Sequence, residues 1–220
     1  AHNISGTGGV FGNLTLNDAN GAVLASDASV TGELKLTAGS FTVGSIELTL
    51  ATTIAGTPNN IVTNASSELI INGGFAAMPS SISTIKNLTF NSAGGTTLAA
   101  DLSVEGVLTL SSGNFNVAGN QLTIKNPIAG TPTNLVTDAT SGLVIAGAVA
   151  GITIPSSVTT LNTLLLDNAN GTSLNVDLDL SGNLTLTNGR LLLNNYDLTL
   201  ATASTIVGAP AASTMIVTNG

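Results

Sequence analysis

The chain contains no cysteine and no tryptophan, and it has only one histidine and one tyrosine among 220 residues. Without cysteine it cannot form a disulfide, a thiolate metal site or a thiol nucleophile. A histidine base could come only from His2, which we expect to be a surface residue near the N-terminus rather than a ligand. We therefore predict that the protein is not an enzyme and has no cofactor.

Charged residues are also scarce, at 7% of the chain against roughly 25% in average proteins. Twelve acidic residues outweigh four basic ones and give a net charge of −8. The basic residues are scattered along the chain: Lys35, Lys86, Lys125 and Arg190. Nucleic-acid binding needs clustered cations to displace counterions. We therefore expect no nucleic-acid partner, and no apolar run approaches the length of about 18 residues that a membrane-spanning helix requires.

What the chain does contain is a repeat with a period of about 75 residues, which is typical of solenoid proteins. The segment NLTLNDANG at Asn13 matches NLTFNSAGG at Asn87 and TLLLDNANG at Thr163, at offsets of 74 and 76 residues. Two glycines hold the same register in each copy: Gly32, Gly106 and Gly182, and Gly39, Gly113 and Gly189. We expect one continuous unit over residues 1–220, with repeats at approximately 1–11 (partial), 12–84, 85–160 and 161–220 (incomplete).

Apolar residues alternate with polar ones inside each repeat, as in Leu34-Lys35-Leu36 and Leu48-Thr49-Leu50. Alternation with period two indicates half-buried β-strands, and the Gly, Asn, Asp and Ser residues between the runs indicate turns. No helical periodicity is present, so we expect an all-β protein. The inward residues should include Phe41 and Val43 together with these leucines.

Two architectures fit short strands with regular turns. One is a parallel β-helix, or β-solenoid, in which each repeat of about 75 residues winds about four coils of about 19 residues. The alternative is a set of tandem β-sandwich domains. We favour the solenoid because the core would be almost entirely aliphatic and no linker divides the repeats. In this register the LTF segment at 88–90 should stack against LTL at 108–110.

The segments LTLSSGNFNVAGNQLTI, IAGTPTNLVTDATSGLVI and IPSSVTTLNTLLLDNANG resemble the long repeat regions of secreted bacterial surface proteins, of the Bacteroidota type. More distantly the chain is similar to autotransporter passengers and filamentous haemagglutinin-like adhesins. This resemblance covers nearly the whole chain. It implies a secreted β-solenoid displayed at the bacterial cell surface for reach, adhesion or fibre building, and it carries no catalytic motif.

Aspartates are the strongest candidates for chemistry, and we expect them to be structural. Asp177 and Asp179 would project from one outer face of a strand about 6.5–7 Å apart, a spacing that could suit a metal or glycoside hydrolysis. This pair occurs in only one repeat and has no cation beside it. Asp27, Asp101 and Asp177 recur at offsets of 74 and 76 and should cap turns, four coils apart, rather than share a Ca²⁺ ion. We predict no metal site and no catalytic site.

Threonines that stand between two inward residues form the third candidate set, listed here as Thr15, Thr49, Thr89, Thr109, Thr123, Thr185 and Thr199. A flat threonine ladder could recognise ice or a carbohydrate, whereas β-propensity on an exposed face explains scattered threonines equally well. We therefore expect an extracellular structural protein, acting as a stalk, an adhesin segment or a fibre subunit. The alternative is a carbohydrate- or ice-binding module that uses an outward Thr/Asn face.

Neither end of the chain carries a pattern that would cap a solenoid, such as an amphipathic helix or a charged strand. The chain also begins at Ala1 rather than at methionine. We therefore expect either a processed piece of a longer solenoid or a subunit that associates head-to-tail through its open ends. The segment 217–219 is in phase with 62–64, so a second copy would nearly continue the repeat.

Overall fold

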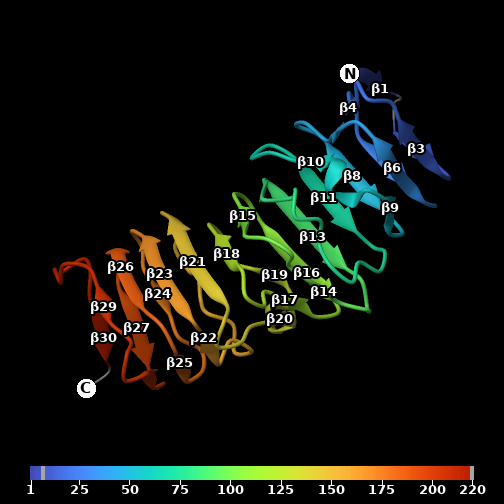
Figure 1. Cartoon of the computed structure of the whole chain (residues 1–220). Coiled ribbons are helices and arrows are strands. Elements are labelled where there is room, and N and C mark those ends of the chain that lie inside the picture. Colours follow the sequence, from blue (N-terminus) through green and yellow to red (C-terminus); the bar gives the residue numbers. More distant parts are fainter. Residues whose placement is uncertain (6–7, 219–220) are drawn as a thin grey trace.

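The chain folds into an elongated β-solenoid with its two termini at opposite ends (Figure 1). The structure is a computed structural model that describes residues 1–5 and 8–218, so Asn219 of the predicted phase match lies outside the described residues. Strands of successive turns pair in parallel, and Leu88 lies beside Leu108 as predicted. Parallel stacking confirms the solenoid and rules out tandem β-sandwiches, whose sheets are antiparallel.

The chain visits three faces in turn as it winds, and we name them face I, face II and face III. Face I consists of a four-stranded and a seven-stranded sheet, with one strand per turn, so the described chain makes eleven turns of about 20 residues. Its strands are β1 (His2–Ile4), β4 (Ala22–Leu24), β7 (Phe41–Thr42), β10 (Ile61–Val62), β12 (Thr84–Ile85), β15 (Leu102–Val104), β18 (Gln121–Ile124), β21 (Gly142–Gly147), β23 (Thr163–Asn168), β26 (Leu184–Asn188) and β29 (Ile206–Val207).

The other two faces are built in the same way, and each is interrupted by a single bridging residue. Face II holds β2 (Gly9–Phe11), β5 (Ala28–Val30), β8 (Glu47–Leu50), β11 (Glu68–Ile71), β13 (Asn87–Asn91), β16 (Leu108–Ser112), β19 (Ala129–Gly130), the bridge at Thr153, β24 (Thr172–Ser173), β27 (Leu191–Asn194) and β30 (Ile216–Thr218). Face III holds β3 (Leu14–Asn17), β6 (Leu34–Ala38), β9 (Ile54–Gly56), the bridge at Ala77, β14 (Thr96–Thr97), β17 (Phe115–Asn116), β20 (Leu135–Val136), β22 (Thr160–Leu161), β25 (Leu178–Leu180) and β28 (Leu198–Leu200).

Helix is almost absent from the described residues, as predicted. The exceptions are two three-residue 3-10 turns, η1 (Pro58–Asn60) and η2 (Pro132–Asn134). They occupy equivalent positions of two repeats, but η1 precedes a strand of face I and η2 precedes a strand of face III.

This difference reflects how the repeats are arranged around the axis. The first full repeat, from β2 to Ala77, contains ten strands and one bridge, which is one face position short of four turns. The equivalent strands β2, β12 and β22 therefore lie on faces II, I and III. Each repeat makes about four coils, as predicted, but it falls one face short of four because a turn takes about 20 residues rather than about 19. Each repeat is consequently rotated by one face relative to the last.

The core is a set of aliphatic stacks that run along the axis, as the alternation predicts. Leu34, Leu36, Phe41, Val43, Leu48 and Leu50 are all buried. Two phenylalanines on neighbouring turns, Phe90 and Phe115, form an edge-to-face pair with ring centroids 5.7 Å apart. A slim aliphatic core suits this fold because each inward side chain must also pack on its counterpart in the turns above and below.

The repeated glycines lie where successive turns touch. Gly113 has φ +72°, and a Cβ atom there would overlap the carbonyl oxygen of Ser92 in the preceding turn. Gly106 lies against the side chain of Asn87, whose Oδ1 accepts the backbone N–H of Val107 at 2.8 Å. Their repeat partners make equivalent contacts, so the glycine register visible in the sequence is a register of contacts between turns.

Candidate functional site

Asp177 and Asp179 do not form a two-carboxylate site. Asp177 lies just before β25, and its Oδ1 accepts the backbone N–H of Asp197 in the next turn at 2.9 Å. Asp179 lies within β25, exposed and paired in register between Thr160 and Thr199. The Asp177 carboxylate therefore joins two turns, and only the Asp179 carboxylate projects freely from the strand.

The three recurring aspartates join successive coils of the solenoid instead of capping a turn within one coil, and they do not form a row. Asp27 Oδ1 accepts the N–H of Glu47, and Asp101 Oδ1 accepts the N–H of Gln121, at 2.9 and 2.8 Å. Together with Asp177, each binds a backbone amide 20 residues further along the chain. They lie one face short of the expected separation of four coils, because the rotation of the repeats places Asp27 before a face II strand and Asp101 before a face I strand.

The outward threonines are likewise split among the faces. On face II, the outward residues of successive turns are Ser29, Thr49, Ile70, Thr89, Thr109 and Ala129. On face I they are Ser103, Thr123, Val144, Leu165, Thr185 and Val207. Adjacent threonines occur only at Thr89 and Thr109 in these two rows, so neither row forms a continuous threonine ladder.

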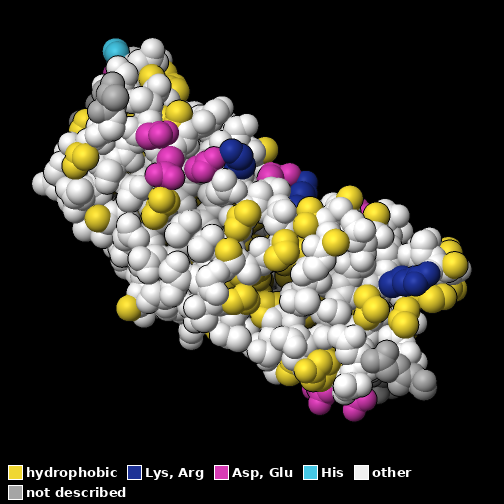
Figure 2. All heavy atoms as spheres, turned by 180° about the vertical axis from the view of Figure 1, so that it is seen from behind, with side chains coloured by type: hydrophobic (Ala, Val, Ile, Leu, Met, Phe, Trp, Pro, Cys, Tyr) yellow, Lys and Arg dark blue, Asp and Glu magenta, His cyan; other side chains and the backbone are white. Residues whose placement is uncertain are grey.

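Charged side chains gather along the edge between faces I and II, where Figure 2 shows acidic and basic groups in one line. From the N-terminal side they are Asp27, Glu47, Glu68, Lys86, Glu105 and Lys125. We call these six residues the charged edge. Two ion pairs join its turns: Lys86 Nζ lies 2.6 Å from Glu68 Oε1, and Lys125 Nζ lies 2.5 Å from Glu105 Oε2.

These ion pairs lower the pKa values of their carboxyl groups. The hydrogen bond from Lys86 lowers the pKa of Glu68, and that from Lys125 lowers the pKa of Glu105. Sequence analysis did not identify the charged edge, although opposite charges 18 and 20 residues apart, near the length of one turn, were a signal for it. The side chains of this edge join neighbouring turns, and Ser103 Oγ also donates to Glu105 Oε1 at 2.8 Å.

His2 is a surface residue, as expected, and it pairs with Asp18 near the N-terminal end of the rod. Its Nε2 lies 2.8 Å from Asp18 Oδ2, and its side chain is 71% exposed. The backbone N–H of Asn20 also binds Asp18, and this hydrogen bond is the main cause of a lowered pKa for that carboxyl group. The pair therefore belongs to the turn that ends at Gly21.

Two shallow hollows occupy equivalent places in the second and third repeats. The first, of about 320 Å³, lies at Gly94–Thr97 and Asn116 on face III, and the second, of about 300 Å³, lies at Asn170–Ser173 on face II. Both are lined largely by glycine, threonine and asparagine. Because the repeats are rotated, the two hollows face different directions and cannot meet one flat ligand surface together.

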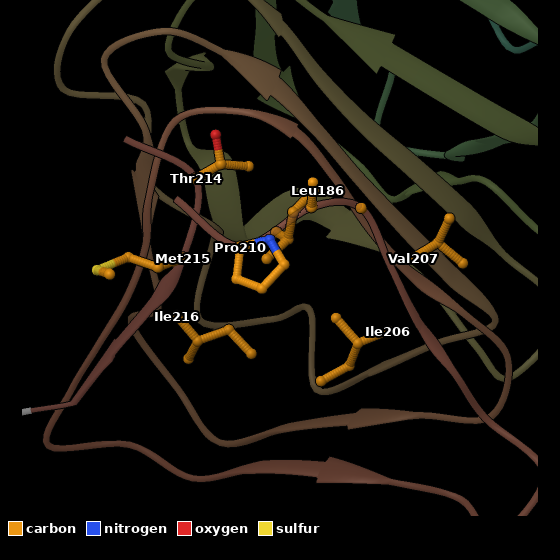
Figure 3. Close-up of a pocket in the computed structure, with 9 residues that line it drawn as sticks. Leu186, Ile206, Val207, Pro210, Thr214, Met215 and Ile216 are labelled. Carbon is orange, nitrogen blue, oxygen red and sulfur yellow. The ribbon is translucent and has the colours of Figure 1, made fainter. Parts of the chain in front are cut away.

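The most enclosed hollow lies in the last turn and has a volume of about 330 Å³. Figure 3 shows Pro210, Leu186, Ile206 and Ile216 around it. Ile206 is paired with the inward Leu184 of the turn below but is 51% exposed. The hollow is therefore a stretch of solenoid core that no further turn covers. It is lined mostly by apolar groups and contains no acid or base.

Two further features of the described chain bear on possible function. No three histidine, cysteine, aspartate or glutamate residues lie close enough together there to hold a metal ion. None of its helices has the length and apolar character needed to cross a membrane.

Comparison with known proteins adds no further assignment. No protein-family model, no curated protein and no solved structure matches the chain.

Proposed function

We propose that this protein is an extracellular structural element of a bacterial cell surface, a β-solenoid rod that serves as a stalk, an adhesin segment or a fibre subunit. One observation carries the proposal: inward side chains stay apolar from turn to turn, whereas outward side chains vary between polar and apolar. On face II the inward stack holds Leu48, Leu69, Leu88 and Leu108 in successive turns. The outward row beside it changes from threonine to isoleucine and back.

This contrast favours a spacer over a binding module. A module for ice or a crystalline carbohydrate needs matching side chains along one flat face, because its ligand has a regular lattice. A spacer needs only an intact core and continuous strand ladders, which resist extension along the axis. Eleven turns at about 4.8 Å each give a rod about 50 Å long.

The location and shape can be tested on cells that produce the protein. We expect antibodies against the chain to label intact cells, and negative-stain microscopy of released material to show stalks or fibres of solenoid width. Labelling only after lysis would contradict the extracellular role. Binding to insoluble polysaccharide that Thr89→Lys and Thr109→Lys abolish would instead support the carbohydrate-binding alternative.

We further propose that the ends of the rod associate with another solenoid turn, either from a second copy or from more of the same chain. At the N-terminal end the inward residues Ile4, Phe11 and Leu14 are only partly buried. At the other end, Ile206 borders the uncovered hollow. Contacts of this kind are heterologous, so they build filaments rather than closed dimers.

Light scattering of the 220-residue chain at micromolar concentration tests this association. We expect the mass to exceed 21.7 kDa and to grow with concentration. Ile206→Lys should reduce this growth, whereas Val107→Lys, at an exposed position on the side of the rod, should not. A concentration-independent mass of 21.7 kDa would contradict self-association.

A further inference from the structure

The hydrogen bonding between turns changes at the boundaries between repeats. Inside a repeat, all three faces are joined by main-chain ladders. At the first boundary, face II continues unbroken, with four registered pairs between β11 and β13. Face I stops at β10 and resumes at β12 in a separate sheet, and face III stops at β9 and resumes at Ala77. Two of the three ladders are therefore interrupted at one level of the rod.

The second boundary repeats this arrangement one face further round. Here face I is the continuous one, with six registered pairs between β21 and β23. Face II is interrupted between β19 and Thr153, and face III between β20 and β22. We call residues 72–85 the first joint and residues 148–161 the second joint.

Side chains replace part of the missing ladder. At the first joint the partly buried Thr63 donates from Oγ1 to the carbonyl oxygen of Thr84 at 2.8 Å. At the second joint the equivalent Thr137 donates to the carbonyl oxygen of Thr160 at 2.9 Å. Both threonines belong to the repeated Val-Thr-Asn/Asp segment, so this contact accounts for part of the sequence repeat.

The two joints differ in their remaining side-chain contacts. Ser157 Oγ donates to the carbonyl oxygen of Leu135 at 2.6 Å in the second joint. The equivalent Ser81 Oγ in the first joint is buried and has no hydrogen-bond partner. In the first joint the backbone N–H of Ser80 instead donates to Asn59 Oδ1 at 2.9 Å. The first joint crosses four registered pairs on its continuous face, against six at the second joint.

The core remains filled through both joints. Phe75, Met78 and Ile82 are buried in the first, and Ile152, Ile154 and Val158 are buried in the second. The joints thus keep their apolar packing while losing most main-chain bonds on two faces. Apolar packing is non-directional, whereas hydrogen bonds fix the relative position of strands.

From these contacts we infer that the repeat boundaries are compliant joints. Neighbouring turns separate at these boundaries before they separate inside a repeat. Each joint gives way on its two interrupted faces and stays held along its continuous face. Because that face is II at the first joint and I at the second, the two joints yield in different directions. A rod built this way bends at defined levels without losing its core. This inference rests on the hydrogen bonding of the fold and does not depend on where the protein is located.

Hydrogen–deuterium exchange read by mass spectrometry tests the inference on the intact chain. We expect amides of 72–85 and 148–161 to exchange faster than those of the turns at 101–124, and the first joint to exchange faster than the second. Thr63→Ala should speed exchange roughly fivefold in the first joint only, and Thr137→Ala should do so in the second joint only, since each removes one hydrogen bond. Each variant is thus the other's control.

Two more variants separate a local effect from general destabilisation. Thr63→Ser keeps the hydroxyl group and should leave exchange at the first joint close to that of the original chain. Thr123→Ala removes an outward threonine within the second repeat and should leave both joints unchanged. Exchange that rises equally throughout the rod in Thr63→Ala, or that does not change at the joint, would overturn the inference.

Discussion

At the scale of single residues, the repeat requires a left-handed backbone at one position of each copy. Gly44 meets this requirement with φ +72°, whereas Ala118 and Asn194 occupy the equivalent positions with φ +50° and +55°. A Cβ atom makes this conformation costly, by about 1–2 kcal/mol per residue. The second repeat therefore carries a local strain that the first avoids.

Replacing Ala118 by glycine should raise the free energy of unfolding by about 0.5–1 kcal/mol, because the relieved strain exceeds the added flexibility of the unfolded chain. Gly44→Ala should lower it by a similar amount. A Cβ at Gly44 would meet only the carbonyl oxygen of Leu24 at 3.8 Å, so the change tests the backbone alone. Denaturant titration measures both, and a loss of stability in Ala118→Gly would disprove the strain.

Two adjacent glycines offer a second test at this scale. Gly95 has φ +71°, and a Cβ there would lie 2.8 Å from the carbonyl oxygen of Asn114 in the next turn. Gly94 has open space around it. Gly95→Ala should therefore cost about 2 kcal/mol or more, and Gly94→Ala less than about 0.5 kcal/mol. Equal melting temperatures would show that the contact between turns does not constrain this position.

At the scale of elements, a strand contributes one inward stack and one outward row. In β16, Leu108 is buried and Thr109 is partly exposed between Thr89 and Ala129 of neighbouring turns. Leu108→Asp would bury an unpaired charge and interrupt the stack, so it should lower stability by about 4 kcal/mol or more. Thr109→Ser should change it by less than about 0.5 kcal/mol. Thermal denaturation compares the two, and similar melting temperatures would contradict the inward assignment of Leu108.

The charged edge gives neighbouring turns a pH-dependent contact. The hydrogen bond from Lys125 lowers the pKa of Glu105 below its ordinary value, so the folded state favours the ionised form. This contribution is therefore present near neutral pH and is lost as the pH falls below about 4.5. Since the pair is partly exposed, we expect it to contribute only about 0.5 kcal/mol.

Glu105→Gln measures that contribution while preserving side-chain size. Urea titration at pH 7 should show the variant to be less stable than the original chain by about 0.5 kcal/mol, and the difference should vanish at pH 3. A difference that persists at pH 3 would point to lost packing instead of the ion pair.

At the scale of the whole molecule, the rotation of the repeats determines what the surface can do. Equivalent hollows, aspartates and threonines are distributed among the three faces. Buried apolar side chains, by contrast, line the core behind every face. Such a rod presents no long uniform face to a regular ligand. It does present joints at regular levels, which suits a spacer that has to bend.

Much of this fold follows from the sequence alone. The alternation of apolar residues identified the strands and the inward stacks, because a side chain's face is set by period two. The offsets of 74 and 76 residues established the repeats, and the glycine register reflected tight contacts between turns. The structural role of Asp27, Asp101 and Asp177 was also predictable, since each precedes a strand at a turn.

Only the tertiary structure decided how the repeats are placed around the axis. Whether a repeat closes four turns or stops one face short depends on the length of every turn, and an increase of less than two residues per turn is enough to move the repeat to another face. The summed length of the turns in a repeat cannot be read from any local sequence pattern. It separated the aspartates that share a register and placed the interrupted ladders at the repeat boundaries.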